Sequence, residues 1–335
     1  MLRLTAYSIS LLLAGLIWFD APAWAHVKWF VDQDTATVSG FQPYSFTDPV
    51  VLIWIGIAIV LVGISIVLDR ILPTIPIVDS KTRHDFIEML RIFTGMSFLL
   101  TAYEGALVAP HLVAHGTLGA VLVFLQAGIG ILLIANRFIK SAAILTFGLY
   151  AGIVAQFGLL SAAEYMNVFG IAMFLLLNNL TAPALQERFK PYSVDMLRIF
   201  TGIALVTLGV SEKLYGAMLG QAFLAEYQWN FMAALGVEFF TDRLFVLSAG
   251  VMEVVFGTIL ILGTVTRLNM LAISGLMLTS NIVFLVQKEN TAALIEFVGH
   301  LPIIATALVL ILLGYGQRLK ITKLPGAGQE QTSSN

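Results

Sequence analysis

The sequence Met-Leu-Arg-Ile-Phe-Thr-Gly occurs twice in this chain, at residues 89–95 and again at residues 196–202. Each copy opens a long apolar run and places one arginine where a charge can lie at a membrane surface. An identity of this length indicates an internal duplication, so the two copies are expected to fold alike. This repeat constrains the fold more than any single motif does.

Weaker similarity extends the duplication beyond the identical block. Residues 126–130 resemble residues 253–257, and residues 163–166 resemble residues 295–298. Each copy therefore contains four apolar segments in the same order, and the second copy carries a longer insert at about residues 215–243.

The composition identifies the class of protein. Hydrophobic residues make up 59% of the chain and charged residues only 11%, whereas a soluble domain has about 25% charged residues. We therefore predict an all-α polytopic membrane protein in contact with membrane lipid. The net charge of −2 gives no indication of a nucleic-acid partner, and the absence of cysteine excludes disulfides and iron–sulfur ligation.

Residues 1–25 resemble a secretory signal peptide. Arg3 precedes an apolar core at residues 9–19, which is too short to span a bilayer, and residues 23–25 have the small-x-small form that signal peptidase cuts. Cleavage would leave His26 as the mature N-terminus, and the alternative is an uncleaved anchor. Residues 26–48 are then a short periplasmic segment.

The apolar runs predict nine membrane-spanning helices. They divide the chain into a first helix and cytoplasmic loop (49–88), repeat one (89–190), repeat two (191–316) and a polar, disordered cytoplasmic tail (317–335). The predicted spans are residues 50–68, then 90–108, 117–135, 141–159 and 163–180 in repeat one, and 197–214, 244–263, 268–286 and 293–315 in repeat two.

Lysine and arginine in the short loops predict the orientation. With the N-terminus in the periplasm and the C-terminus in the cytoplasm, most of these cations lie on the cytoplasmic side of a bacterial inner (plasma) membrane. Those on that side include Arg70, Lys81, Arg83, Arg137, Lys140, Arg188, Lys190 and Arg267. Because each repeat has an even number of helices, the repeats are parallel rather than inverted.

Ionisable groups inside a membrane are costly and usually face a bundle interior or a wet cavity. Glu253 lies near mid-membrane, with Lys213 as its expected counter-charge. Glu296 and His300 are four residues apart and share one helix face, where they could carry protons. We take these four as candidate catalytic residues and Glu253, Lys213 and Asn281 as candidate cofactor-binding residues. The alternatives are a structural pair for Glu296 and His300, and a lysine that snorkels to the membrane surface.

Repeat one differs at the corresponding positions. It has Gln126 where repeat two has Glu253, and Ala106 where repeat two has Lys213. We therefore expect the working site in repeat two and a degenerate scaffold in repeat one.

Histidines at the periplasmic side suggest a metal site. If Pro110 begins a helix, His111 and His115 lie on one face of it. His26, as a new N-terminus, would add an imidazole and an amine, which are donors that suit copper or zinc. The alternative is unrelated surface histidines.

Small residues are expected where helices pack closely in a membrane. The glycines predicted to serve this purpose are Gly128, Gly130, Gly148, Gly152, Gly257 and Gly275.

Repeat two resembles the DoxX/DoxD family of small four-helix membrane proteins. The resemblance lies in Gly209-Val-Ser-Glu-Lys213-Leu, in Glu253-x3-Gly257 and in Arg267, which closes Gly263-Thr-Val-Thr-Arg. It covers about residues 193–315, and repeat one matches loosely because it lacks the lysine and the glutamate. The resemblance implies a four-helix fold for each repeat and a link to membrane redox systems and quinones.

These observations lead to three functional hypotheses. The first is a quinone- or redox-associated membrane subunit with a polar pocket in the periplasmic half of repeat two, working with a redox partner subunit. The second is a transporter or permease for a small solute or a metal ion such as copper, and the third is a non-catalytic assembly scaffold. Haem is not expected, because His300 is the one histidine within a predicted span.

Overall fold

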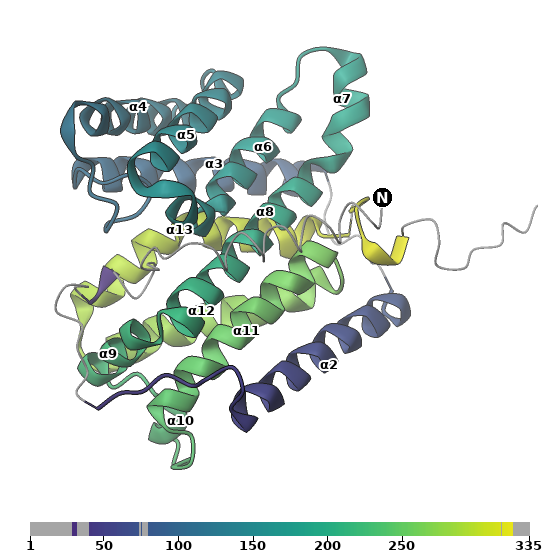
Figure 1. Ribbon diagram of the computed structural model, residues 1–335. Helices are drawn as coiled ribbons and strands as arrows, with labels where there is room; N and C mark the ends of the chain where they lie inside the picture. The colour runs from purple at the N-terminus through teal and green to yellow at the C-terminus, as the bar shows by residue number, and fades with distance from the viewer. Residues whose placement is uncertain (1–28, 32–39, 74, 76–79, 316, 324–335) are drawn as a thin grey trace, which may run out of the picture.

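The computed structural model describes residues 29–31, 40–73, 75, 80–315 and 317–323 (Figure 1). The predicted signal peptide and His26 lie outside these residues. The α-helices are α2 (Pro49–Ile71), α3 (Ser80–Tyr103), α4 (Gly116–Ile134), α5 (Ile139–Glu164), α6 (Met166–Asn178), α7 (Pro183–Phe189), α8 (Ser193–Leu208), α9 (Ala217–Tyr227), α10 (Phe231–Ala234), α11 (Asp242–Leu262), α12 (Thr266–Val286) and α13 (Asn290–Leu313). Short 3-10 turns cover Lys190–Tyr192 and Ile321–Lys323, and a π-helical segment, Gly209–Tyr215, continues α8.

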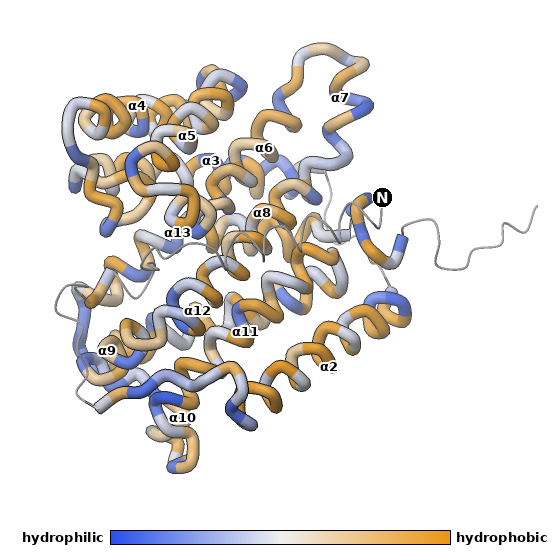
Figure 2. Tube along the Cα trace, in the orientation of Figure 1, coloured by the Kyte–Doolittle hydropathy of each residue, from blue (hydrophilic) through white to orange (hydrophobic). Residues whose placement is uncertain are grey.

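The all-α polytopic membrane fold is confirmed. In the described part of the chain, eight helices are long and apolar enough to cross a membrane. Figure 2 shows α2 as a mostly hydrophobic rod along one side of the molecule, and only 11% of its apolar window is buried against other helices. Lipid would cover the rest of that surface.

One of the nine predicted spans, the fifth along the chain, is shorter than expected. The stretch at 163–180 forms α6, which has 13 residues, whereas about 20 are needed to span the hydrocarbon core. The helix begins one residue after α5 ends, because Tyr165 adopts a non-helical backbone conformation. A break between two helices therefore lies at the end of α5, beside the buried Glu164.

The duplication is visible in the packing of the helices. In repeat one α3 packs on α4 and α5 on α6, and in repeat two α8 packs on α11 and α12 on α13. The last helix of each repeat also packs on the first helix of the other, α6 on α8 and α13 on α3. The two repeats are thus interlocked rather than joined end to end (Figure 1).

The arginines of the repeated block are buried and do not lie at a solvated surface. Arg91 donates hydrogen bonds to two carbonyl oxygens at the C-terminal end of α4, and Arg198 donates to two near the end of α11. Carbonyls at a helix C-terminus lack intrahelical partners and attract a cation. Each repeat therefore uses its arginine to fix the first helix to the second.

Two glycine pairs allow these helices to approach closely. A Cβ atom on Gly202 would lie 2.6 Å from the carbonyl oxygen of Gly257, and one on Gly95 would lie 2.9 Å from that of Gly130. The predicted close contacts are confirmed at Gly130, Gly152 and Gly257 but are wrong for Gly128, Gly148 and Gly275, which have nothing within 4 Å of a Cβ.

The start of the polar tail is packed rather than disordered. Asp69, near the end of α2, accepts hydrogen bonds from Lys320 Nζ and Thr322 Oγ1, each at 2.7 Å. It also accepts one at 2.9 Å from the backbone N–H of Val265, in the turn between α11 and α12. Asp69 of α2 therefore fixes the start of the tail to the end of the helix bundle. The polar composition of the tail gives no indication of this contact.

Candidate functional site

A cavity of about 360 Å³ lies inside repeat two. It is bounded by α8, α9, α11, α12 and α13, and Trp54 of α2 closes one side. Most of its lining is aromatic, aliphatic or methionine side chains. The polar lining residues are Lys213, Ser248, Glu253, Ser280, Glu296 and His300.

The first polar group on the wall is centred on Lys213. Its Nζ lies 2.9 Å from Glu253 Oε1 and 3.0 Å from Glu212 Oε2. Glu212 is fully buried, whereas the Glu253 side chain is 28% exposed. One ammonium group thus bridges two carboxylates, and one of these carboxylates lines the cavity.

The π-helical segment positions this cluster. Gly209–Tyr215 continues α8 with wider turns, which are often found at functional sites. Gly209 makes room for α11, because a Cβ there would lie 2.7 Å from the carbonyl oxygen of Gly250. The predicted pairing of Lys213 with Glu253 is present, and their catalytic role stays a prediction.

The second polar group lies on the α12 and α13 side. Ser280 Oγ donates to Glu296 Oε1 at 2.8 Å, and His300 Nδ1 donates to the backbone oxygen of Glu296 at 2.7 Å. His300 Nδ1 is also 3.6 Å from Glu296 Oε1, and the Trp29 ring centre lies 5.0 Å from the imidazole. The expected shared helix face brings Glu296 and His300 together at the cavity.

Asn281 does not join this site. Its amide donates a long hydrogen bond of 3.4 Å to the Met277 carbonyl of its own helix, and it does not line the cavity. Its neighbour Ser280 lines the cavity instead. Successive side chains on an α-helix point about 100° apart. Ser280 therefore faces the cavity while its neighbour Asn281 faces away from it.

Three residues of the wider cluster were not among the predicted site residues. Glu212 is the second partner of Lys213, and Ser211 Oγ donates at 2.8 Å to Oε1 of the buried Glu164. These contacts link the end of α5 in repeat one with the site in repeat two. The adjacent Ser-Glu-Lys at residues 211–213 was a signal for Glu212, but nothing in the sequence pairs Glu164 with Ser211.

Repeat one has no counterpart of this cluster at Gln126. That side chain is completely buried, and its Oε1 accepts from the Val108 backbone N–H at 2.8 Å. Its Nε2 donates to Thr101 Oγ1 at 2.8 Å. The neutral amide therefore holds a loop in place, and the scaffold role of repeat one stays a prediction.

The two loop histidines are not on one helix face. Residues 104–115 form a turn closed by a bridge between Ala106 and Val113, and α4 begins only at residue 116. The His111 ring lies 5.9 Å from Tyr165, and the His115 ring 5.4 Å from Phe157. The prediction that Pro110 begins a helix carrying His111 and His115 is therefore wrong, because Pro110 lies within this turn. Across the described ranges, no three potential side-chain ligands form a metal-binding group.

The fold and the cavity define a polytopic helical membrane protein with an internal, mainly apolar cavity that has two separate polar groups. No protein-family model, curated protein or solved structure gives a significant match to the chain. The resemblance of repeat two to the DoxX/DoxD family thus stays a prediction.

Proposed function

We propose that the cavity of repeat two binds a lipid-soluble quinone and that the protein is a quinone- or redox-associated subunit of a membrane complex. The observation that carries this proposal is an aromatic and aliphatic cavity with a Lys–Glu pair and a Glu–His pair on different walls. Ligand sites are commonly of this kind, with an apolar lining and a few convergent polar groups.

A quinone has an apolar ring and two carbonyl oxygens on opposite sides of that ring. The Lys213 ammonium can donate to one oxygen, and His300, with Glu296 beside it, serves the other. Reduction to the quinol takes up two protons and two electrons. Residues of the site, Lys213 on one side and His300 with Glu296 on the other, would deliver the two protons. The two electrons would come from a redox partner subunit.

Transport and assembly are the competing functions. Rocking of one repeat against the other would place a transport site between the repeats, but this cavity is lined by repeat two together with Phe30 and Trp54. This placement favours binding over alternating access. In a pure scaffold, the charged residues would serve only stability.

Binding is tested with the purified full chain in detergent. A short-chain ubiquinone and a short-chain menaquinone analogue are titrated while quenching of tryptophan fluorescence is followed, since Trp54 and Trp229 line the cavity. Glu253→Gln is expected to weaken binding about tenfold, because it removes the charge that orients Lys213 towards the quinone, a loss typical of one charged hydrogen bond. The control is Glu104→Gln, an exposed carboxylate just after α3.

Equal binding by Glu253→Gln and the wild type, or no binding of either quinone, would reject this function. Quinone-independent flux of a solute in proteoliposomes would favour transport instead. Loss of a co-purifying subunit in Glu253→Gln without any loss of quinone binding would favour the scaffold.

We also propose the inner membrane as the location, with the N-terminus in the periplasm. The chain has no cysteine, so single cysteines in place of Glu238 and Arg137 report each side without background. A membrane-impermeant maleimide applied to intact cells should label the first and not the second.

A further inference from the structure

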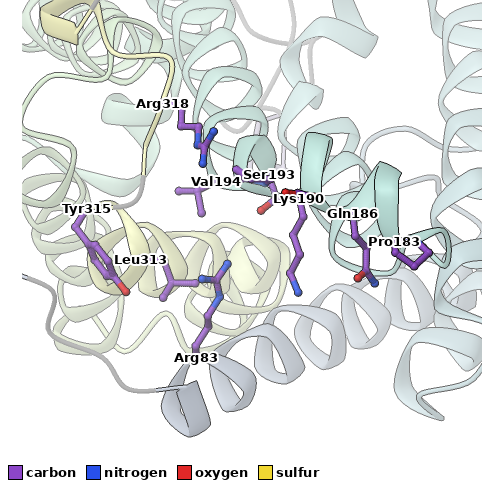
Figure 3. A pocket seen from close by; sticks show the side chains of 11 residues that line it. Arg83, Pro183, Gln186, Lys190, Ser193, Val194, Leu313, Tyr315 and Arg318 are labelled. Carbon is purple, nitrogen blue, oxygen red and sulfur yellow. The ribbon is translucent and has the colours of Figure 1, made fainter.

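A second cavity, of about 640 Å³, lies at the other end of α8 from Lys213. It is bounded by the start of α3, by α7, by the start of α8 and by the end of α13, so it lies at the seam between the repeats (Figure 3). Its charged lining consists of three cations, Arg83, Lys190 and Arg318, and one carboxylate, Glu187.

Within the described part of the chain, the three cations have no carboxylate partner. None of the ion pairs among the described residues includes Arg83, Lys190 or Arg318. Arg318 stands over the Tyr192 ring at 5.9 Å, which leaves its N–H groups available for an anion. Three cations around one cavity repel one another, and a bound anion would offset that repulsion.

A buried hydroxyl on the same cavity adds an independent observation. Ser193 is 1% exposed, lines the cavity, and its Oγ has no hydrogen-bond partner within the described structure. Figure 3 shows Ser193 on the wall between Arg318 and Lys190. A buried hydroxyl without a partner is costly, and an anionic oxygen would accept its hydrogen bond.

The cavity also has apolar lining residues. Val194 and Leu313 lie at one end and Pro183 at the other (Figure 3), next to helix ends that begin or complete membrane spans. Basic groups beside apolar surface at a membrane boundary suit a lipid phosphate, with its glycerol and acyl chains continuing over apolar residues. On the predicted topology this end of the bundle faces the cytoplasm.

We propose that this cavity is a binding site for a phosphate-bearing anion, with Arg83, Lys190, Arg318 and Ser193 as its ligands. The chemistry favours the phosphodiester of an anionic glycerophospholipid over a free phosphate. The bound anion would neutralise cations contributed by both repeats and so hold the seam together.

The test uses the purified full chain in detergent and native mass spectrometry. Phosphatidylglycerol is titrated against phosphatidylcholine, and inorganic phosphate and glycerol phosphate are added as separate competitors. The triple variant Arg83→Gln/Lys190→Gln/Arg318→Gln should lose phosphatidylglycerol binding by about tenfold or more, because each surface cation contributes measurably to anionic-lipid affinity.

The matched control is Arg70→Gln/Arg137→Gln/Lys140→Gln. It removes the same charge from exposed cations on the same predicted side of the membrane, away from the cavity. An equal loss in both triple variants would overturn the site, because it would show a general charge effect. Competition by inorganic phosphate or glycerol phosphate would assign the site to a soluble anion, whereas phosphatidylglycerol binding that neither competitor reduces would assign it to lipid.

A second variant does not depend on a loss of binding. Glu187→Gln removes the one carboxylate that lines the cavity and should strengthen phosphatidylglycerol binding about twofold to fivefold. This gain cannot result from misfolding. Unchanged or weaker binding in a folded Glu187→Gln protein would reject the proposal.

Discussion

Gln126 of α4 and Glu253 of α11 hold the same position in the two repeats, four residues before the glycine at each helix crossing. The amide is completely buried and fastens a loop, whereas the carboxylate binds Lys213 and lines a cavity. The exchange of amide and carboxylate, together with that of Ala106 and Lys213, thus separates the buried loop contact of repeat one from the charged cluster of repeat two.

The Lys213 cluster predicts an unequal cost for its members. Lys213→Met leaves the buried Glu212 without its ammonium partner and should destabilise the protein by about 3 kcal/mol. Glu253→Gln keeps the contact between Lys213 and Glu212 and should cost about 1 kcal/mol. Denaturant unfolding in micelles measures both values, and equal costs would contradict the bridging arrangement.

The helix crossings make a prediction about glycine. Gly257→Ala places a methyl group against the backbone of α8, where a Cβ would lie 2.6 Å from the Gly202 oxygen, and should cost about 1–3 kcal/mol. Gly128→Ala, in open space on α4, should be neutral or stabilising by up to about 1 kcal/mol because alanine favours helix. Thermal unfolding of the two variants in one detergent makes the comparison, and similar melting temperatures would count against the crossing.

The two buried arginines predict an order of sensitivity. Arg198 also donates to the Leu319 carbonyl at 2.8 Å and to Asp195 at 3.2 Å, and both members of this ion pair are fully buried. Lysine cannot replace a planar group with so many donors, so Arg198→Lys should cost about 2–4 kcal/mol. Arg91→Lys should cost less, because the Glu88 side chain of its ion pair is 26% exposed. Unfolding free energies that reverse this order would disprove the account.

The tie between α2 and the tail can be tested by proteolysis. Asp69→Asn removes the charge that holds Lys320 and Thr322, so the segment at 317–323 should detach more often. Trypsin should then cut after Lys320 and Lys323 faster than in the wild type, as read by mass spectrometry of the released peptides. Asp48→Asn, at the other end of α2, is the control and should leave these rates unchanged.

Much of the fold follows from the sequence because lipid allows few alternatives. A chain with apolar runs of helix length must satisfy its backbone hydrogen bonds within each run, which explains why eight spans are confirmed. The sequence identity between the repeats also predicts the matching roles of Arg91 and Arg198, although not their burial. The arginines are buried because they donate to unpaired carbonyl oxygens at the C-terminal end of a neighbouring helix. A sequence pattern does not show which helix end will lie beside them.

The candidate site is less predictable. Spacing of four brings Glu296 and His300 together, and opposite charge brings Lys213 to Glu253. Glu212 joins them at a π-helical segment, which breaks the ordinary helical period on which sequence reasoning depends. The helix predicted to carry His111 and His115 is absent for a related reason, because the loop that holds them has no fixed period.

The last helix of each repeat packs on the first helix of the other, α6 on α8 and α13 on α3. This crosswise packing has an evolutionary and a practical consequence. In a single four-helix unit, the surfaces of the first and last helices that here contact the other repeat would have no partner. The precursor is therefore expected to have been a homodimer, later fused into one gene. Two half-chains divided at the α6–α7 connection and produced together should reassemble, whereas either half alone should associate with itself or aggregate.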